Sequence, residues 1–344
     1  MASHRRPKQP SRARVTFFGA TAVATAALAS THAAQADPNP TLEEVQEEVE
    51  ELNHEAEEAI EEYNGVKEEE QELQDEVEEL QDSAARGQEE LNELRGSLGS
   101  VASSQYRNGG LDPSVQLFLS ADPDAYLDQA STLDQVSGRQ AETLRSIEAQ
   151  QRTLDQQREE ATEKLDELEQ LREELDEQKD IIQGRLNDAQ ELLNQLTAEE
   201  QAELEAQQEQ EAADAAAAAG GPVDLSGASS YGAAALSAAQ TALGAPYVWG
   251  ATGPSSFDCS GLTSWAYSQA GVSLPRISQD QAYAGATVSR DQLAPGDLVF
   301  FYDELSHVGI YAGNGQMIHA PRPGGVVEYS SLDVMPFMWG VRVG

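Results

Sequence analysis

The sequence contains a single cysteine, Cys259, among 344 residues. Basic residues are also scarce, since 21 Lys and Arg stand against 61 Asp and Glu and give a formal net charge of −40. A surface with this charge repels phosphate backbones, which excludes DNA and RNA as direct partners. No apolar run reaches the about 20 residues that a membrane-spanning helix needs, so we expect no stable membrane insertion.

The N-terminus is the basic exception, and it indicates the compartment. Basic residues at 5, 6, 8, 12 and 14 precede a short apolar run, and Ala34 and Ala36 form an A-x-A cleavage site. This order is typical of a secretory signal peptide covering residues 1–36, with a retained membrane anchor as the alternative. We therefore expect a secreted, extracellular protein. In an oxidising compartment an unpaired cysteine is either an inert buried residue or a working thiol.

Residues 37–199 form an acidic region with a seven-residue apolar repeat, which predicts long coiled-coil helices. In the first helix the repeat is carried by two rows: Val45, Leu52, Ala59, Val66, Leu73, Leu80, Leu94 and Val101, then Val49, Ala56, Tyr63, Val77, Ala84, Leu91 and Leu98. Gly and Pro interrupt the pattern near 107–132, where we expect a helical tip. A second, weaker repeat follows. The pattern favours an antiparallel hairpin, and two halves of a parallel homodimer are the alternative.

The composition changes twice after the second helix. Residues 200–228 are rich in Ala, Gln and Gly, which predicts a fraying helix that becomes a linker. Residues 229–344 contain aromatic and β-branched residues with regular Gly and Pro, and are long enough for one small domain with its own core.

Cys259 lies in FDCSG, immediately before a predicted amphipathic helix that stops at Gly271. The unpaired amides and the dipole at a helix start favour an anion, so this placement predicts a lowered thiol pKa and a reactive sulfur.

A nucleophilic thiol needs a base, and the domain offers His307 and His319. The segments 307–312 and 316–320 predict a β-hairpin. A turn centred on Gly313 would make the two histidines direct cross-strand partners, whereas a plain two-residue Asn-Gly turn would place them on opposite faces. The apolar pattern favours the first register, in which one imidazole is the base and the other orients it. Two structural histidines and a Cys/His/His zinc site are the alternatives, and His54 is expected to be a solvated surface residue.

Several segments together resemble the NlpC/P60 family of papain-like cell-wall peptidases: YVWG, DCSG before a helix, LPR with Ser278 and Gln281 downstream, PGDLVFF, HVGIYAGNG and MIHA. The resemblance covers essentially all of residues 229–344. It implies an α+β fold in which a cysteine-bearing helix packs on an antiparallel sheet, here preceded by the coiled-coil hairpin. It also implies cleavage of peptidoglycan stem peptides, usually between D-γ-glutamate and meso-diaminopimelate, without a cofactor.

The same resemblance suggests roles for individual residues. Cys259 would be the nucleophile, His307 its base and His319 the orienting partner. Tyr247, Asp258 and Ser260 would hold the substrate, with Asp258 facing a free amine; a simple helix cap is its other explanation. Arg276 would either meet substrate carboxylates or lie on the surface.

Two functions follow from these features. The first is an exported cysteine endopeptidase for wall remodelling or daughter-cell separation. Its coiled coil would either be a stalk that projects the hydrolase through the wall or, as in similar architectures, a regulatory hairpin that restrains the peptidase and engages an FtsEX-type transporter. The second is a non-catalytic scaffold or activator of other wall hydrolases. The presence of Cys259, His307 and His319 together favours the enzyme.

Overall fold

The structure, a computed structural model, describes residues 41–107, 115, 123–219, 225 and 227–344. The predicted signal peptide, most of the predicted tip and part of the predicted linker lie outside these residues. No helix within the described ranges is long and apolar enough to cross a membrane.

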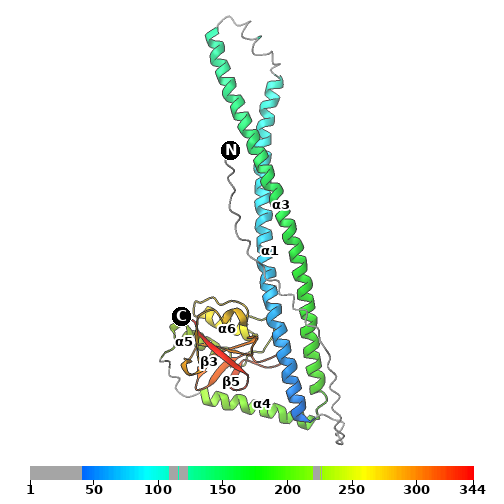
Figure 1. The fold of residues 1–344 in the computed structure, drawn as a ribbon, viewed down its shortest axis with the longest axis vertical. Helices are drawn as coiled ribbons and strands as arrows, with labels where there is room; N and C mark the ends of the chain where they lie inside the picture. Colours follow the sequence, from blue (N-terminus) through cyan, green and yellow to red (C-terminus); the bar gives the residue numbers. More distant parts are fainter. Residues whose placement is uncertain (1–40, 108–114, 116–122, 220–224, 226) are drawn as a thin grey trace, which may run out of the picture. The chain divides into compact units, whose positions relative to one another are not determined.

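Two long helices, α1 (Leu42–Arg107) and α3 (Pro123–Leu193), run side by side in Figure 1. Their apolar side chains meet in separate clusters along the pair. Val45 near the start of α1 packs with Leu196 just beyond α3, whereas Leu91 much later in α1 packs with Leu154. The order is reversed between the helices, so the pairing is antiparallel and intramolecular. The predicted coiled-coil hairpin is therefore confirmed.

The second apolar repeat is weak for a structural reason. Leu144 and Leu165, two apolar residues of this repeat, are 47% and 46% exposed. Ion pairs join the helices beside the seam instead, including Arg185 to Glu55 at 2.8 Å and Arg172 to Glu70 at 3.0 Å. Exposed pairs of this kind add at most about 1 kcal/mol each, so the apolar seam supplies most of the pairing energy.

Helix α4 (Ala198–Ala219) occupies much of the segment that the sequence predicts to be a linker. Thr197 caps it: the Thr197 backbone N–H donates to the Glu200 carboxylate at 2.8 Å, and the Glu200 N–H donates to the Thr197 hydroxyl at 3.3 Å. The helix packs on strand β5, and Ala215 and Ala219 are buried there. It covers an edge strand that would otherwise present unpaired backbone groups.

The C-terminal domain is α+β, as predicted. Its six-stranded antiparallel sheet has the order β1-β6-β2-β3-β4-β5. The strands are β1 (Ala286–Val288), β2 (Leu298–Phe301), β3 (His307–Gly313), β4 (Gln316–His319), β5 (Glu328–Ser331) and β6 (Phe337–Arg342). The helices are α5 (Ser230–Thr241), α6 (Cys259–Gln269) and the short α7 (Ser278–Gln281), with a 3-10 turn at Arg290–Gln292.

Both faces of the central strands are buried. On one face Phe300, Val308 and Ile310 pack with Leu262 of α6 in the main core. On the other face Val299 and Phe301 form a smaller cluster with Met317 and Leu332. This double burial explains why the β2 sequence LVFF is a continuous apolar run rather than an alternating pattern.

The β3–β4 hairpin differs from the predicted register. Its turn is Asn314-Gly315, with both residues at positive φ, and Ile310 rather than Val308 lies opposite Ile318. A register shift between Tyr311 and Gly313 adds one residue to β3. A plain Asn-Gly turn would place the side chains of His307 and His319 on opposite faces of the sheet. The extra residue shifts the pairing by one position, so both side chains lie on the same face as diagonal neighbours. They are not direct cross-strand partners, because the same register continues to place Gly309 opposite His319.

Candidate active site

Cys259 is the first residue of α6, and its position is fixed by the cap in front of it. The Asp258 carboxylate accepts the Gly261 N–H at 2.7 Å and closes the first turn. A side chain at Gly261 would put its Cβ 2.2 Å from the Ala251 carbonyl oxygen, so only glycine allows the preceding loop to approach the helix this closely. The predicted placement of the thiol at a helix start is therefore observed.

The histidines form a continuous hydrogen-bonded chain leading away from the sulfur. His307 Nε2 lies 2.8 Å from His319 Nδ1, and His319 Nε2 lies 2.9 Å from the Ser330 hydroxyl on β5. Burial, then the neighbouring His307 and Arg322, lower the pKa of His319 well below its usual value, which keeps that ring neutral. A ring nitrogen of His307 lies within 4.8 Å of Cys259 Sγ. Sequence reasoning did not identify Ser330, whose residue type and position in a half-exposed strand carry no distinctive signal.

The largest surprise is that α1 of the coiled coil enters this site. Glu57, Glu61 and Asn64 are only 4%, 1% and 2% exposed, although they belong to a highly charged helix. Glu57 Oε1 lies 2.9 Å from His307 Nδ1, the ring nitrogen that is not bonded to His319. The nitrogen that a proton-accepting His307 would use is thus already occupied.

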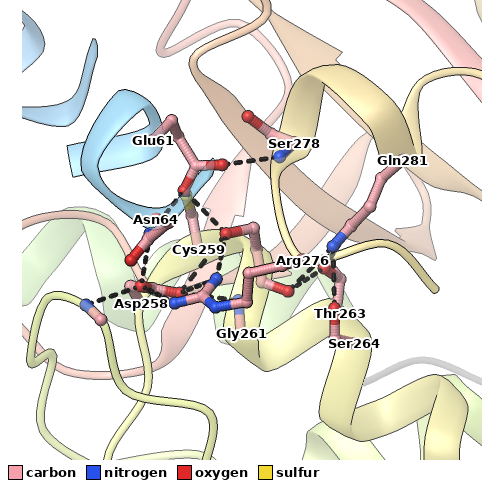
Figure 2. Close-up of polar contacts among 12 residues, drawn as sticks. Glu61, Asn64, Asp258, Cys259, Gly261, Thr263, Ser264, Arg276, Ser278 and Gln281 are labelled. Atoms are coloured by element: carbon pink, nitrogen blue, oxygen red, sulfur yellow. Dashed lines mark hydrogen bonds and ion pairs between the residues drawn. The ribbon is translucent and has the colours of Figure 1, made fainter. Parts of the chain in front are cut away.

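Glu61 contacts the residues at the starts of α6 and α7, as Figure 2 shows. Its carboxylate accepts the Ser278 backbone N–H at 2.6 Å and the Ser260 hydroxyl at 2.7 Å, and the Cys259 thiol donates to it at 3.6 Å. One side chain from α1 therefore touches both the sulfur and a residue predicted to bind substrate.

Asp258 is held by more contacts than a helix cap alone would need. Arg276 makes a two-point ion pair with it, at 2.5 and 3.2 Å, and also donates to Ser260 at 2.7 Å. Gly250 N–H and the Asn64 side-chain amide donate to its second oxygen at 2.8 and 3.1 Å. The Arg276 side chain is only 15% exposed, so it points into the site and is not a surface residue.

Further contacts of α1 flank these acidic residues. The ring of His54 stacks on Tyr302 at 3.7 Å between centroids, and its Nε2 lies 2.6 Å from the Glu304 carboxylate. Tyr63 packs edge-on against Trp249. The prediction that His54 is a solvated residue is therefore wrong, because its ring lies against the C-terminal domain.

The electrostatics of the sulfur also differ from the prediction. Burial raises the pKa of the Cys259 thiol well above its usual value, and the Glu61, Glu57 and Asp258 carboxylates raise it further against the opposing effect of Arg276. Burial and the neighbouring Asp258 likewise raise the pKa of Glu61 to about 7. The helix start predicted a lowered thiol pKa, but burial of the sulfur, and after it the carboxylates of Glu61, Glu57 and Asp258, shift the pKa in the opposite direction. With α1 in place, the sulfur is a thiol.

Tyr247 lies beside the same group. It is 5% exposed, and its buried hydroxyl has no hydrogen-bond partner among the described residues. Burial and the nearby Cys259 and Glu57 raise its pKa well above the usual value, so it stays a neutral phenol with a proton to donate.

All six residues predicted for the site are buried in this domain. Asp258, Cys259 and Ser260 are consecutive at the start of α6, where Ser260 also contacts Asp258, and His307 contacts His319 across the hairpin. Sequence reasoning missed Glu57, Glu61 and Asn64 entirely. They are spaced at i, i+4 and i+7, which places them on one helix face. That spacing was not informative beforehand, because acidic residues occur at almost every turn of α1.

Comparison with known proteins agrees with this location. Residues 244–341 match the NlpC/P60 family. A probable endopeptidase of Corynebacterium glutamicum is 55% identical over 115 residues, which cover 33% of this chain and 55% of that protein. Probable endopeptidase p60 of Listeria monocytogenes is 50% identical over 99 residues, which cover 28% of this chain and 20% of that one. The match thus spans about half the length of the Corynebacterium relative.

Solved structures resemble the same third of the chain. The NlpC/p60 domain of the peptidoglycan hydrolase SagA is 39% identical, with 33% of this chain and 98% of that chain covered and a TM-score of 0.32. The peptidoglycan hydrolase RipB of Mycobacterium tuberculosis is 34% identical, with 33% and 64% covered and a TM-score of 0.31.

Proposed function

Residues 244–341 belong to the NlpC/P60 family, and from that premise we propose that this protein is an exported endopeptidase of peptidoglycan stem peptides. The observation that carries the proposal is the hydrogen-bonded chain from His307 through His319 to Ser330, with the Cys259 sulfur at a helix start and within 4.8 Å of a His307 ring nitrogen. This is the nucleophile, base and orienting partner that acyl transfer requires.

In the proposed reaction His307 Nδ1 takes the Cys259 proton, and the sulfur attacks the carbonyl carbon of the scissile amide. For Nδ1 to accept a proton, the ring's own proton must sit on Nε2, where His319 Nδ1 accepts it. His319 in turn donates from Nε2 to Ser330. The histidine chain is compatible with this tautomer, in which Nδ1 can act as the base once Glu57 no longer contacts it.

The attack produces a tetrahedral oxyanion next to the first turn of α6. Amides in the first turn of a helix have no partner within the helix, so the Cys259 N–H is a natural donor to this oxygen. The unpaired Tyr247 hydroxyl is a second donor. Protonated His307 then gives its proton to the leaving amine, and water hydrolyses the resulting thioester to a carboxylic acid and the free thiol.

The polar groups around Cys259 suit a short, charged peptide. Asp258 supplies a carboxylate for a free amine, and Ser260 and Arg276 supply donors for a carboxylate. A stem peptide trimmed to L-Ala–D-Glu carries both charges. We therefore assign cleavage to the bond between D-γ-glutamate and meso-diaminopimelate, with Tyr247, Asp258 and Ser260 as substrate-binding residues.

The proposed enzyme is restrained by its own coiled coil. Glu57 occupies the basic nitrogen of His307, and Glu61 takes up the donors that a substrate carboxylate would use. The thiol is 1% exposed beneath them. Substrate can enter only after α1 moves away, and an FtsEX-type transporter that pulls on the coiled coil would supply such a signal.

Replacement of the nucleophile tests the catalytic proposal. We expect Cys259→Ala to abolish release of stem-peptide fragments from purified sacculi by the activated protein, while the unfolding midpoint stays close to that of the wild type. Mass spectrometry of the soluble products identifies the bond cut. Undiminished release by the variant would contradict the enzyme and favour the non-catalytic activator of other hydrolases.

A further inference from the structure

We propose that Glu57 completes a zinc site with Cys259 and His307, so that one Zn²⁺ ion fastens α1 to the domain that carries the thiol. The regulatory meaning of this site rests on the proposed function, because it blocks the proposed nucleophile and base. The binding itself rests only on the positions of the three side chains.

The first support is the arrangement of donor atoms. A carboxylate oxygen of Glu57, the sulfur of Cys259 and a ring nitrogen of His307 all lie within 4.8 Å of one another, and all three residues are buried. Tetrahedral zinc with bonds of about 2.0–2.3 Å spaces its ligands roughly 3.3–3.8 Å apart, so modest side-chain rotations bring these atoms to coordination distance. A sulfur, nitrogen and oxygen set favours zinc over magnesium or calcium, which prefer oxygen alone.

The second support is the shell around the donors. His307 Nδ1 faces Glu57 while Nε2 bonds to His319, and His319 bonds onward to Ser330. A zinc-bound imidazole usually donates its other N–H to such a partner, which fixes the ring and its tautomer. Glu61 Oε1 lies 3.6 Å from the sulfur but does not belong to this group of mutually close donor atoms, so a water molecule is expected as the fourth ligand.

The third support is the charge of the surroundings. The site buries the carboxylates of Glu57, Glu61 and Asp258 beside a single guanidinium, that of Arg276. A divalent cation balances this excess of negative charge. The buried Tyr247 hydroxyl has no hydrogen-bond partner among the described residues. Tyr247 belongs to the same buried cluster as Cys259, so its hydroxyl can donate to a zinc ligand or to zinc-bound water.

Binding involves no oxidation or reduction. Cys259 loses its thiol proton to solvent, and a sulfur electron pair bonds to the ion. His307 binds through the Nδ1 lone pair with its proton on Nε2, so the proton shared between Nδ1 and Glu57 leaves both atoms, either to solvent or by tautomer exchange to Nε2. Glu57 exchanges its contact with His307 for a bond to the metal. The sulfur can then no longer attack and His307 can no longer accept a proton. Release of α1 additionally requires a metal–oxygen bond to break.

Cobalt provides a direct test, because Co²⁺ occupies zinc sites and reports thiolate ligation by a charge-transfer band. Cys259 is the only cysteine in the chain, so any such band comes from this residue. We expect the metal-free full chain without its predicted signal peptide to develop the band with one equivalent of Co²⁺, and Zn²⁺ to displace it. We expect Cys259→Ser to show no band and Glu57→Gln to raise the half-saturating Co²⁺ concentration at least tenfold.

Glu58→Gln is the matched control, because Glu58 is the exposed neighbour of Glu57 on the same helix; its half-saturation should equal that of the wild type. Circular dichroism of each metal-free variant verifies folding. Glu57→Asp keeps the carboxylate but shortens the side chain by one methylene, and its half-saturating Co²⁺ concentration should also exceed that of the wild type. A wild type without the band, or equal half-saturation in wild type and Glu57→Gln, overturns the proposal. Metal-free cleavage of sacculi is measured separately, so failure of the zinc site and failure of the peptidase give different results.

Discussion

At the scale of single residues, the histidine pair shows how contacts within the site prepare the chemistry. His319 touches neither the sulfur nor, in the proposed mechanism, the substrate; it acts through His307 Nε2. Its neutral state follows from burial, which lowers its pKa well below the usual value. In the proposed mechanism His319 is therefore a positioning residue, and its loss should affect proton transfer more than substrate binding.

We predict that His319→Ala lowers kcat by roughly 10²–10⁴-fold with little change in KM, by analogy with the loss of an orienting carboxylate in serine peptidases. His319→Gln, which keeps a hydrogen-bonding group near His307, should recover part of this loss. Both are measured with a soluble stem peptide in the Glu57→Ala/Glu61→Ala background, so that α1 does not limit access. A change confined to KM would argue that His319 only shapes the pocket.

At the scale of elements, the start of α6 depends on a close approach that only glycine permits. A Cβ on Gly261 would lie 2.2 Å from the Ala251 carbonyl oxygen and 2.7 Å from the Asp258 carboxylate that caps the helix. The Ala251 carbonyl also accepts the Asp258 backbone N–H at 3.0 Å. The position of Cys259 thus depends on both the Ala251 loop and the Asp258 cap, which contact each other and Gly261.

We predict that Gly261→Ala destabilises the C-terminal domain by about 1–3 kcal/mol, because the backbone rather than a flexible side chain must move. Gly96→Ala in α1 is the matched control, since nothing lies within 4 Å of its Cβ and alanine is the better helix former; it should stabilise by roughly 0.5–1 kcal/mol. Chemical denaturation of each variant provides the comparison. An unchanged free energy of unfolding in Gly261→Ala would mean that the loop at Ala251 can move away without a measurable cost.

At the scale of the whole described chain from Thr41 onward, the acidic coiled coil contacts the domain that carries Cys259 at the candidate site. Polar side chains of α1 replace solvent and substrate around Cys259 and raise the pKa of its thiol. Around the sulfur these contacts are hydrogen bonds and ion pairs, which can be exchanged for water, while the ring contacts of His54 with Tyr302 and of Tyr63 with Trp249 add a smaller apolar part. Such an interface suits a reversible restraint.

We predict that Glu57→Ala/Glu61→Ala accelerates alkylation of Cys259 by iodoacetamide, and cleavage of sacculi, by at least about tenfold, since a tenfold shift needs only about 1.4 kcal/mol. The control is Glu58→Ala/Glu62→Ala, which removes two carboxylates with the same spacing from exposed positions. Equal rates in the two double variants would contradict the proposal that Glu57 and Glu61 restrain the thiol. Acceleration of alkylation without cleavage would separate access from catalysis.

The sequence alone determined the parts whose signals are local or periodic. Apolar side chains every seven residues predict the hairpin helices, and the LPR, DCSG and HVGIYAGNG segments predict the domain and its candidate site. The register of the β3–β4 hairpin was not determined, because one bulged residue between Tyr311 and Gly313 changes the pairing without changing the apolar alternation. Only the tertiary structure decided that α1 enters the site. The face made of Glu57, Glu61 and Asn64 has no hydrophobic period, so its sequence does not distinguish it from the exposed faces of α1. Its carboxylates differ from the others on α1 because they are buried, and a buried carboxylate needs specific hydrogen-bond partners that only the tertiary structure supplies.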